Sequence, residues 1–233
     1  MQLARALFTQ GFGSRRECAA LCLAGRVRVR GALLDDPAAE IDADAVEVDG
    51  RPWPLRAKAL VLLHKPPDVE CSRKPRDHPS VLSLLPIPLR RRGVQPVGRL
   101  DADTTGLLLL TDDGALIHRW THPKRHLPKV YEVSTKHPVD AAMLQALRDG
   151  VTLVDDPVPV RAAAAEATGT HALRLTLTEG RYHQVKRMLA AAGNRVEGLH
   201  RSAFGALVLP AELAPGDWCW VEPADVDASI IGA

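Results

Sequence analysis

Two short apolar runs are the strongest constraint on how this chain of 233 residues folds. The runs ALVLL at 59–63 and GLLLL at 106–110 are each bounded by charged or turn-forming residues. Runs of this length suit strands and are far shorter than the ~18 residues of a membrane helix. Because hydrophobic residues (46%) and charged residues (25%) are both at ordinary levels, we expect two buried strands in a globular protein.

The other periodicities and turn signals predict an α+β fold. Strict alternation at 26–30 and 129–135 indicates half-buried strands, and further strands are expected at 153–160, 172–178 and 206–209. Helices are expected at 3–8, from the capping box of Ser14 and Glu17 to Gly25, near 81–85, at 141–148 and at 181–192. Because strands dominate and helices are interspersed irregularly, the sheet should be mixed and mainly antiparallel.

Charge is distributed unevenly along a chain whose net charge is only +2. Residues 1–31 carry six arginines and one acid, whereas residues 32–50 carry seven acids and no lysine or arginine. A second basic cluster spans 73–92. Such clusters suit a phosphate backbone, although solvated arginine faces would give the same pattern. We expect a basic domain at 1–50, a proline-containing linker at 51–58 and a larger domain at 59–233.

Several classes of site find no support in the sequence. The four cysteines are scattered and the N-terminus lacks the long apolar core of a secretory signal, so we expect reduced thiols in a cytoplasmic protein. His118, His122 and His126 have helical metal-ligand spacing, but Pro123 interrupts it. No P-loop, dinucleotide fingerprint or nucleophile elbow occurs. We therefore expect neither a metal nor a cofactor.

The segment from 97 to 114 carries the most informative polar residues. A loop rich in charged and turn-forming residues leads directly into the second apolar run, which places Asp101 close to the apolar layer. A carboxylate held there needs a partner, because its desolvation is otherwise costly. From spacing alone, a turn-capping role for Asp101 or Asp103 is favoured over catalysis, and a hydrolase that uses both carboxylates is a further alternative.

The residues around Asp101 resemble the signature loop of the RNA pseudouridine synthases, most closely the small-ribosomal-subunit (RsuA-like) branch. The match begins with GRLD at 98–101 and TGLL at 105–108. Further blocks follow in that family's order: KP at 65–66, CS at 71–72, DHPSV at 77–81, KVY at 129–131, EGRYHQVKRM at 179–188 and LHR at 199–201. Residues 14–17 and 24–27 resemble the core of an S4-type RNA-binding domain. Together these blocks cover nearly the whole chain.

This resemblance implies a fold and a reaction. The fold would be a small S4-like RNA-binding domain followed by a pseudouridine synthase domain on a mixed, mainly antiparallel sheet. The enzyme, a monomer without cofactor, would convert a uridine of bacterial 16S rRNA (position 516 in the usual rRNA numbering) to pseudouridine. Its substrate would be free 16S rRNA or a small-subunit assembly intermediate. Two alternatives stay open: a sibling enzyme acting on 23S rRNA, and a non-catalytic S4-type RNA-binding protein of the ribosome.

By the same resemblance, three residues form the catalytic set. Asp101 would be the nucleophile or base, Lys186 the cation that keeps it ionised, and Tyr131 the ring that stacks on the extruded uracil. Tyr131 could instead be a core residue, and Lys186 an exposed helix lysine. His183 and Gln184 are expected to shape their loop.

Contacts to RNA are assigned to arginines. Arg99 would bind phosphate or fill the gap left by the flipped base, unless it pairs with Asp103 or Asp112. The other expected RNA-binding residues are Arg15, Arg16, Arg26, Arg28, Arg30, Arg73, Arg181, Arg187 and Arg201.

Overall fold

The structure, a computed structural model, describes residues 1–154 and 156–227. Residue 155, inside the strand expected at 153–160, and residues 228–233, at the end of the domain expected at 59–233, lie outside the described residues. The chain divides into two compact units. The amino-terminal unit comprises 1–59, 82–95 and 111–113, and the sheet unit comprises 60–81, 96–110 and 114–233. None of the described helices is long and apolar enough to cross a membrane.

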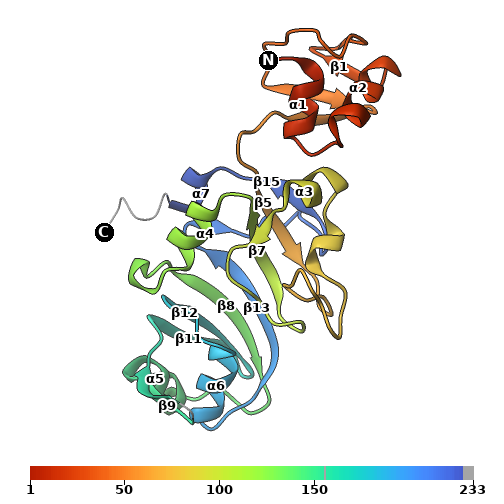
Figure 1. Cartoon of the computed structure of the whole chain (residues 1–233). Coiled ribbons are helices and arrows are strands. Elements are labelled where there is room, and N and C mark those ends of the chain that lie inside the picture. Colours follow the sequence, from red (N-terminus) through yellow and green to blue (C-terminus); the bar gives the residue numbers. More distant parts are fainter. Residues whose placement is uncertain (155, 228–233) are drawn as a thin grey trace. The chain divides into compact units, whose positions relative to one another are not determined.

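The amino-terminal unit contains two helices that pack on each other and a four-stranded antiparallel sheet (Figure 1). Helix α1 (Leu3–Thr9) is followed by α2 (Arg15–Leu23), which begins at the predicted capping box. The Glu17 amide donates to the Ser14 hydroxyl at 3.3 Å, and the Ser14 amide donates to the Glu17 carboxylate at 2.6 Å. The sheet order is β2 (Ala32–Leu33), β1 (Val27–Val29), β3 (Ala45–Val48) and β4 (Arg51–Pro54).

Strand β4 corrects the linker expected at 51–58. Its residues pair with β3, and Trp53 stands opposite Val46. The Trp53 side chain is buried, with its ring edge-on to Phe12 and the ring centroids 5.2 Å apart. Pro52 and Pro54 are tolerated because β4 is an edge strand, where a missing N–H donor breaks no ladder. The buried indole therefore makes this proline-containing segment part of the folded unit.

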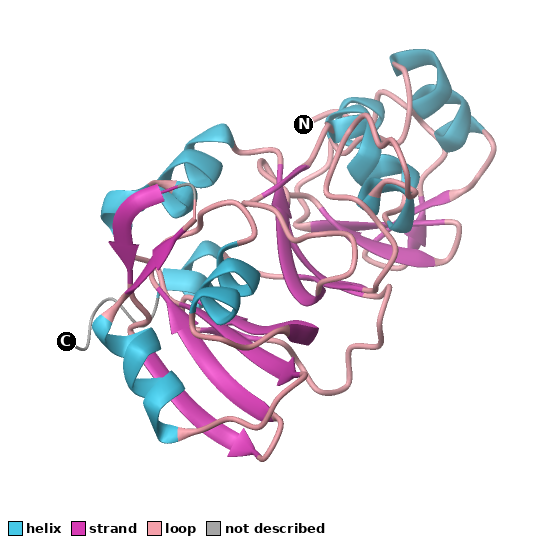
Figure 2. Cartoon of the chain, turned by 90° about the horizontal axis from the view of Figure 1, so that it is seen from below, coloured by secondary structure: helices cyan, strands magenta, loops and turns pink. Residues whose placement is uncertain are grey.

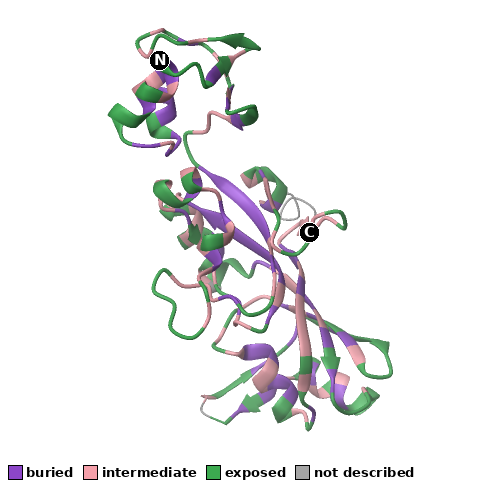
Figure 3. Ribbon diagram, turned by 90° about the vertical axis from the view of Figure 1, so that its right-hand side faces the viewer, coloured by how far each residue is buried: buried purple, intermediate pink, exposed green. Residues whose placement is uncertain are grey.

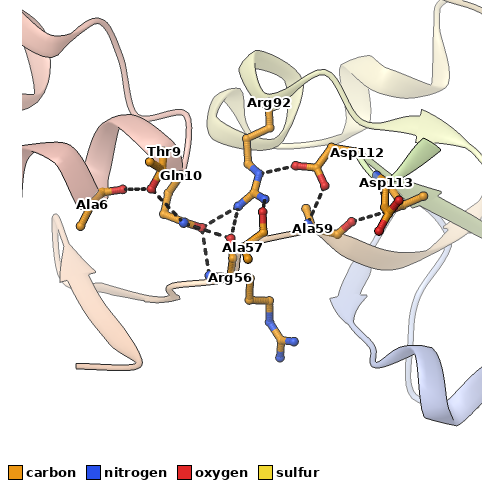
Figure 4. A network of polar contacts seen from close by, with 10 residues as sticks. Ala6, Thr9, Gln10, Arg56, Ala57, Ala59, Arg92, Asp112 and Asp113 are labelled. Atoms are coloured by element: carbon orange, nitrogen blue, oxygen red, sulfur yellow. Dashed lines mark hydrogen bonds and ion pairs between the residues drawn. The ribbon is translucent and has the colours of Figure 1, made fainter. Parts of the chain in front are cut away.

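A buried arginine joins the separate segments of the amino-terminal unit (Figure 4). Arg92 lies at the end of α3 (Ile87–Arg92), and its side chain is only 4% exposed. It donates to the Asp112 carboxylate at 2.7 Å, to the Gln10 side-chain carbonyl at 2.7 Å and to the main-chain oxygens of Arg56 and Ala57 at 2.9 and 3.0 Å. Arg92 belongs to the basic cluster at 73–92, but its charge is used inside the protein and not on a phosphate.

The sheet unit is built on a mixed sheet with the strand order β11-β12-β8-β13-β7-β5-β15 (Figure 2, magenta). These strands are β5 (Leu60–Lys65), β7 (Thr105–Thr111), β8 (Lys129–Thr135), β11 (Ala164–Gly169), β12 (Ala172–Leu177), β13 (Val196–Phe204) and β15 (Trp218–Trp220). Strands β7 and β13 pair in parallel, whereas β11–β12, β12–β8, β8–β13 and β5–β15 are antiparallel. The predicted mixed, mainly antiparallel sheet is confirmed.

Shorter elements complete the chain. They are the helices α4 (Gly114–Thr121), α5 (Ala141–Asp149), α6 (Gln184–Ala191) and α7 (Pro223–Asp227), the 3-10 turns η1 (Val81–Leu84) and η2 (Pro123–Arg125), and the strands β6 (Gln95–Pro96), β9 (Val151–Leu153), β10 (Asp156–Val160) and β14 (Leu207–Val208). The Asp140 carboxylate caps α5 by accepting a hydrogen bond from the Met143 amide at 2.7 Å. The single strand expected at 153–160 is divided between two antiparallel strands, since Leu153 ends β9 and 156–160 form β10.

The two apolar runs form neighbouring strands at the buried centre of the sheet unit (Figure 3, purple). Leu62 of β5 and Leu107 and Leu109 of β7 are fully buried, in a cluster with Trp120 and Phe204. Full burial of each such side chain contributes roughly 1.5–3 kcal/mol of transfer free energy. The two strands that the sequence predicted most directly therefore hold the sheet unit together.

The longest strand, β13, was not among the expected strands. It spans nine residues, VEGLHRSAF, and pairs with β8 on one side and β7 on the other. The sequence predicted only the strand at 206–209, which is the short hairpin partner β14. A strand in the middle of a sheet ordinarily has an apolar sequence. Because His200 and Arg201 are polar, the sequence of β13 does not show this pattern, and the strand was not predicted.

Arg92→Met should lower the free energy of unfolding by about 2–4 kcal/mol, because it leaves a buried carboxylate and three other acceptors without their donor. Urea unfolding followed by circular dichroism measures the change. The control Arg91→Met removes an exposed cation, 3.5 Å from Glu17 and 46% exposed, and should cost less than about 1 kcal/mol. Equal effects of the two substitutions would contradict the role given to Arg92.

Candidate active site

A cavity of about 340 Å³ lies on one face of the sheet unit, over β8 and β13. The loops that precede β7 and α6 complete its walls. In the antiparallel register, Tyr131 stands opposite Arg201 and Lys129 stands opposite Phe204. Because opposite residues and alternate residues share a face of a sheet, these four side chains point to the same side, and all four line the cavity.

A close approach between β7 and β13 brings the Asp101 loop to this cavity. Arg201 and Gly106 are partners in the parallel register. Gly106 has φ +107°, and a Cβ there would lie 2.3 Å from the carbonyl oxygen of Arg201. Only glycine fits this position, which explains why the glycine follows Thr105 in the apolar run.

The structure brings Asp101 and Lys186 together, as the resemblance implied. The Lys186 Nζ lies 3.2 Å from Oδ2 of Asp101, although the two residues are 85 positions apart in the sequence. Both side chains are 29% exposed. The carboxylate is therefore reachable from the cavity and has a cation beside it.

Lys186 has a second and closer acidic partner. Its Nζ donates to both carboxylate oxygens of Asp103, at 2.7 and 2.8 Å. Burial opposes the charged state of Lys186, but the hydrogen bond to Asp103 and the charge of Asp101 outweigh it and raise the pKa of Lys186. Burial likewise opposes ionisation of Asp103, and the hydrogen bond from Lys186 outweighs it, so the pKa of Asp103 is lowered. Lys186 is therefore a firmly protonated cation shared by two carboxylates.

His183 is a contact of Asp101 that the sequence analysis did not assign. Its Nε2 lies 3.3 Å from Oδ1 of Asp101, and its ring stacks on Tyr182 with centroids 3.8 Å apart. His183 precedes α6 in a left-handed conformation, φ 46°. The spacing of three residues between His183 and Lys186 was the available signal, since such residues share a helical face. Gln184 shapes the loop as expected, accepting from the Arg181 amide at 2.7 Å.

A buried lysine fixes the backbone around the two carboxylates. Lys65, at the end of β5, has no exposed surface. Its Nζ donates to the main-chain oxygens of Pro66, Ala102 and Thr104, at 3.0, 2.9 and 2.8 Å. Burial lowers the pKa of Lys65, against the attraction of Cys71, Asp103 and Asp101. Because two of the acceptors flank Asp103, the ammonium holds the loop that carries both acids.

Tyr131 and Arg99 both line the cavity. Tyr131 is on β8 and only 9% exposed, so it packs in the sheet face and also lines the cavity. Arg99 is exposed. Its alternative partners are taken, because Asp103 is bound by Lys186 and Asp112 by Arg92.

The arginines expected to bind RNA fall into three groups. Arg15, Arg16 and Arg73 are exposed. Others contact acceptors of the protein: Arg26 with Asp49, Arg28 with Glu47, Arg30 with the Asp42 carbonyl, Arg181 with Asp156 and Glu179, and Arg187 with the Tyr182 carbonyl. Arg201 differs from the other arginines, since it is only 2% exposed, its Nε donates to the Leu107 carbonyl at 2.8 Å, and it lines the cavity. A residue buried this deeply in the sheet can meet only a part of the RNA that enters the cavity, and not the RNA backbone on the surface.

Comparison with known proteins identifies the family of this site. A family model described as RNA pseudouridylate synthase matches residues 59–191, more than half of the chain. The chain belongs to the RNA pseudouridylate synthase family. The enzyme is thus an RNA pseudouridine synthase, an isomerase, and the predicted family and activity are confirmed.

Relatives of the synthase match over most of its length. "Ribosomal small subunit pseudouridine synthase A" of Yersinia pestis is 39% identical over 220 residues, covering 94% of this chain and 93% of that protein. The protein of the same name from Escherichia coli (strain K12) is 40% identical over 195 residues, covering 83% and 84%. "Uncharacterized RNA pseudouridine synthase YtzG" of Bacillus subtilis (strain 168) is 38% identical over 224 residues, covering 94% and 93%.

The fold matches a solved structure of the same kind. A crystal structure of a pseudouridylate synthase superposes with a TM-score of 0.69 and 32% sequence identity. The match covers 97% of this chain and 98% of that one.

Lys65→Met should lower the free energy of unfolding by about 3 kcal/mol, because three main-chain acceptors lose a charged donor. Urea unfolding measures the loss, and the rate of pseudouridine formation should fall as the loop of Asp101 and Asp103 loosens. Lys58→Met, an exposed lysine just before β5, is the control and should change stability by no more than about 0.5 kcal/mol. A Lys65→Met protein as stable as the control would mean that the ammonium does not hold the loop.

Proposed function

We propose that the synthase converts one uridine of 16S rRNA, at position 516, to pseudouridine, with Asp101, Lys186 and Tyr131 as its catalytic set. The observation that carries the proposal is the Asp101 carboxylate, held by Lys186 and His183 beside a cavity that Tyr131 lines. The small-subunit target is supported by two relatives that bear small-subunit names at 39% and 40% identity.

The reaction needs a carboxylate but no outside reagent. The N1–C1′ bond of uridine breaks, the uracil rotates, and C5 bonds to C1′ while C5 loses a proton and N1 gains one. Product and substrate are isomers, so no oxidant, reductant or energy source takes part. Asp101 acts as nucleophile or base and must be ionised for either role. The ammonium of Lys186 lies 3.2 Å from the carboxylate and attracts its negative charge.

The cavity suits a base that has left its helix. Enzymes that act on a base inside RNA or DNA extrude it into a pocket, where aromatic and apolar side chains stack on it. Tyr131 and Phe204 supply such surfaces here, and the exposed Arg99, on the same loop as Asp101, can hold a phosphate of the extruded nucleotide. The cavity volume of about 340 Å³ is sufficient for a single base.

The amino-terminal unit supplies RNA affinity in this proposal. We assign residues 1–50 to an S4-type RNA-binding domain, extended by β4. Arg15 and Arg16 are the first two residues of α2, and both are exposed. They are better candidates for phosphate contacts than Arg26 and Arg28, which already lie beside acids. The substrate in this proposal is 16S rRNA or a small-subunit assembly intermediate, and we propose that the enzyme acts on it as a monomer in the cytoplasm.

Asp101→Asn should abolish pseudouridine formation, by about 10³-fold or more, because the amide has the same shape but is neither a nucleophile nor a base. Chemical mapping of pseudouridine in 16S and 23S rRNA, after incubation with each variant, measures how much product forms and at which uridine it forms. Asp149→Asn, an exposed carboxylate of α5, is the control and should keep full activity. Product from Asp101→Asn would remove this residue from the catalytic set, and product on 23S rRNA alone would replace the target.

Combining Arg15→Ala with Arg16→Ala should weaken rRNA binding and make its salt dependence shallower. Each lost phosphate contact reduces the slope of log K against log salt by up to about 0.9. Arg26→Ala should change the slope less, because its guanidinium already pairs with Asp49 at 2.6 Å. Filter binding across a salt series gives both slopes, and an unchanged slope in the double variant would take α2 out of the RNA interface.

A further inference from the structure

Two cations on the sheet face of the cavity have no part in the chemistry described so far. Lys129 of β8 and Arg201 of β13 flank the Phe204 ring, with Nζ of Lys129 and Cζ of Arg201 at 5.5 and 5.3 Å from its centroid. Both residues line the cavity next to Tyr131. Because Tyr131 and Arg201 are cross-strand partners and Lys129 is two residues from Tyr131, the three side chains adjoin on one face.

Among the described residues, neither cation meets an acid, and Arg201 has a donor left over. Arg201 is 2% exposed and its Nε donates to the Leu107 carbonyl, but its Nη2 is buried with no partner among the residues that the structure describes. Lys129 donates to the Leu127 carbonyl at 3.0 Å. In the part of the chain that the structure describes, neither residue forms an ion pair with a carboxylate. Burying a guanidinium donor without a partner costs free energy, so the arrangement is favourable only when an acceptor arrives.

The two cations also disfavour each other. Burial lowers the pKa of Lys129 to about 8, with a further contribution from the charge of Arg201, while Glu179 acts in the opposite direction. Two neighbouring cations on a buried surface raise the local potential and attract negative charge. The missing partner is therefore an anion, or a group that becomes one.

We propose that Lys129 and Arg201 form an anion subsite that stabilises the negative charge developing on the uracil oxygens during isomerisation. This inference rests on the proposed function and adds a stabilising site for the leaving base. Lys129 and Arg201 would act on the transition state in the manner of an oxyanion hole, through donors fixed in place before the reaction.

The chemistry requires such a site by every route open to Asp101. If Asp101 attacks C1′ or removes a sugar proton, the N1–C1′ electron pair leaves with the uracil, and the charge spreads to O2 and O4. If Asp101 attacks C6 of the base, the C5–C6 electron pair moves onto the ring and the charge reaches O4. In each case the charge is released again when C5 bonds to C1′, the C5 proton is lost and N1 is protonated.

Depth in the cavity distinguishes the base from a phosphate. An RNA phosphate stays near the surface, where the exposed Arg99 lies, whereas an extruded base inserts along the Tyr131 ring. Arg201 and the half-buried Lys129 belong to the sheet face that the base would reach. We therefore assign the subsite to the uracil, and a phosphate contact is the outcome that would contradict it.

The test is the single-turnover rate of pseudouridine formation in an rRNA fragment, measured beside RNA affinity. Lys129→Met should reduce the rate about 10²-fold, as loss of one oxyanion donor does in other enzymes, with affinity and its salt slope unchanged. Lys129→Arg should recover much of the rate, because it keeps the charge. Lys136→Met, an exposed lysine just after β8, is the control and should match the unaltered enzyme.

The pH profile gives a second, independent reading. Activity needs Lys129 protonated, so the rate should fall as pH rises through about 8, and Lys129→Arg should move this alkaline limb to higher pH. The charged groups that face Lys129 are Arg201 from β13 and Glu179 after β12. Ionisation of the uracil itself is the same in every variant and cannot produce the difference.

Three results would overturn the inference. They are a Lys129→Met rate within about threefold of the control, a loss of affinity with a salt slope shallower by about 0.9 per contact, or an unmoved alkaline limb in Lys129→Arg. Thermal unfolding by circular dichroism checks that each variant is folded, and Arg201→Lys repeats the test from the other strand. If the unaltered enzyme makes no pseudouridine, the proposed function fails. If it does and Lys129→Met is equally fast, only the subsite fails.

Discussion

The close parallel approach of β7 and β13 is the constraint on which the site depends. At Gly106 the two backbones come so near that no side chain fits between them. This contact sets the loop of Asp101 beside the strand that follows α6, the helix of Lys186. A larger residue at Gly106 would separate the strands and draw the carboxylate away from its cation. The catalytic geometry is thus a consequence of backbone packing inside the sheet.

The electrostatics of the site follow from this packing. Lys65 donates hydrogen bonds to the carbonyl oxygens on either side of Asp103, and Lys186 forms ion pairs with both Asp101 and Asp103. The charges on this side of the loop are therefore balanced within the protein. On the sheet face, Lys129 and Arg201 form no ion pair among the described residues, and only the charge of Glu179 acts on Lys129 from nearby, which is the asymmetry expected of a site whose substrate gains negative charge.

The sequence was informative where local rules decide the structure. The capping box of Ser14 and Glu17 and the two apolar runs depend on neighbours in the chain, and both were predicted correctly. Asp101 could be singled out only by resemblance, since its spacing alone favoured a turn. The burial of Arg92 and Arg201 was not predicted, because a buried arginine and an exposed one look alike in sequence and only long-range packing decides which of them is buried. The resemblance gave the family, whereas the contact of His183 with Asp101 needed coordinates.

The central place of β13 in the sheet has a consequence for how the chain folds while it is being synthesised. Thr105 and its partner His200 are separated by 95 positions, so the sheet closes only through a contact of very long range. Contacts of this kind form late, because closing a large loop is entropically costly, and they cannot form before both segments have been synthesised. The edges of β7 and β8 that pair with β13 therefore stay open until the segment ending at Phe204 has emerged. Open strand edges can pair with other chains, so this is the stage of synthesis at which the sheet is most exposed to aggregation.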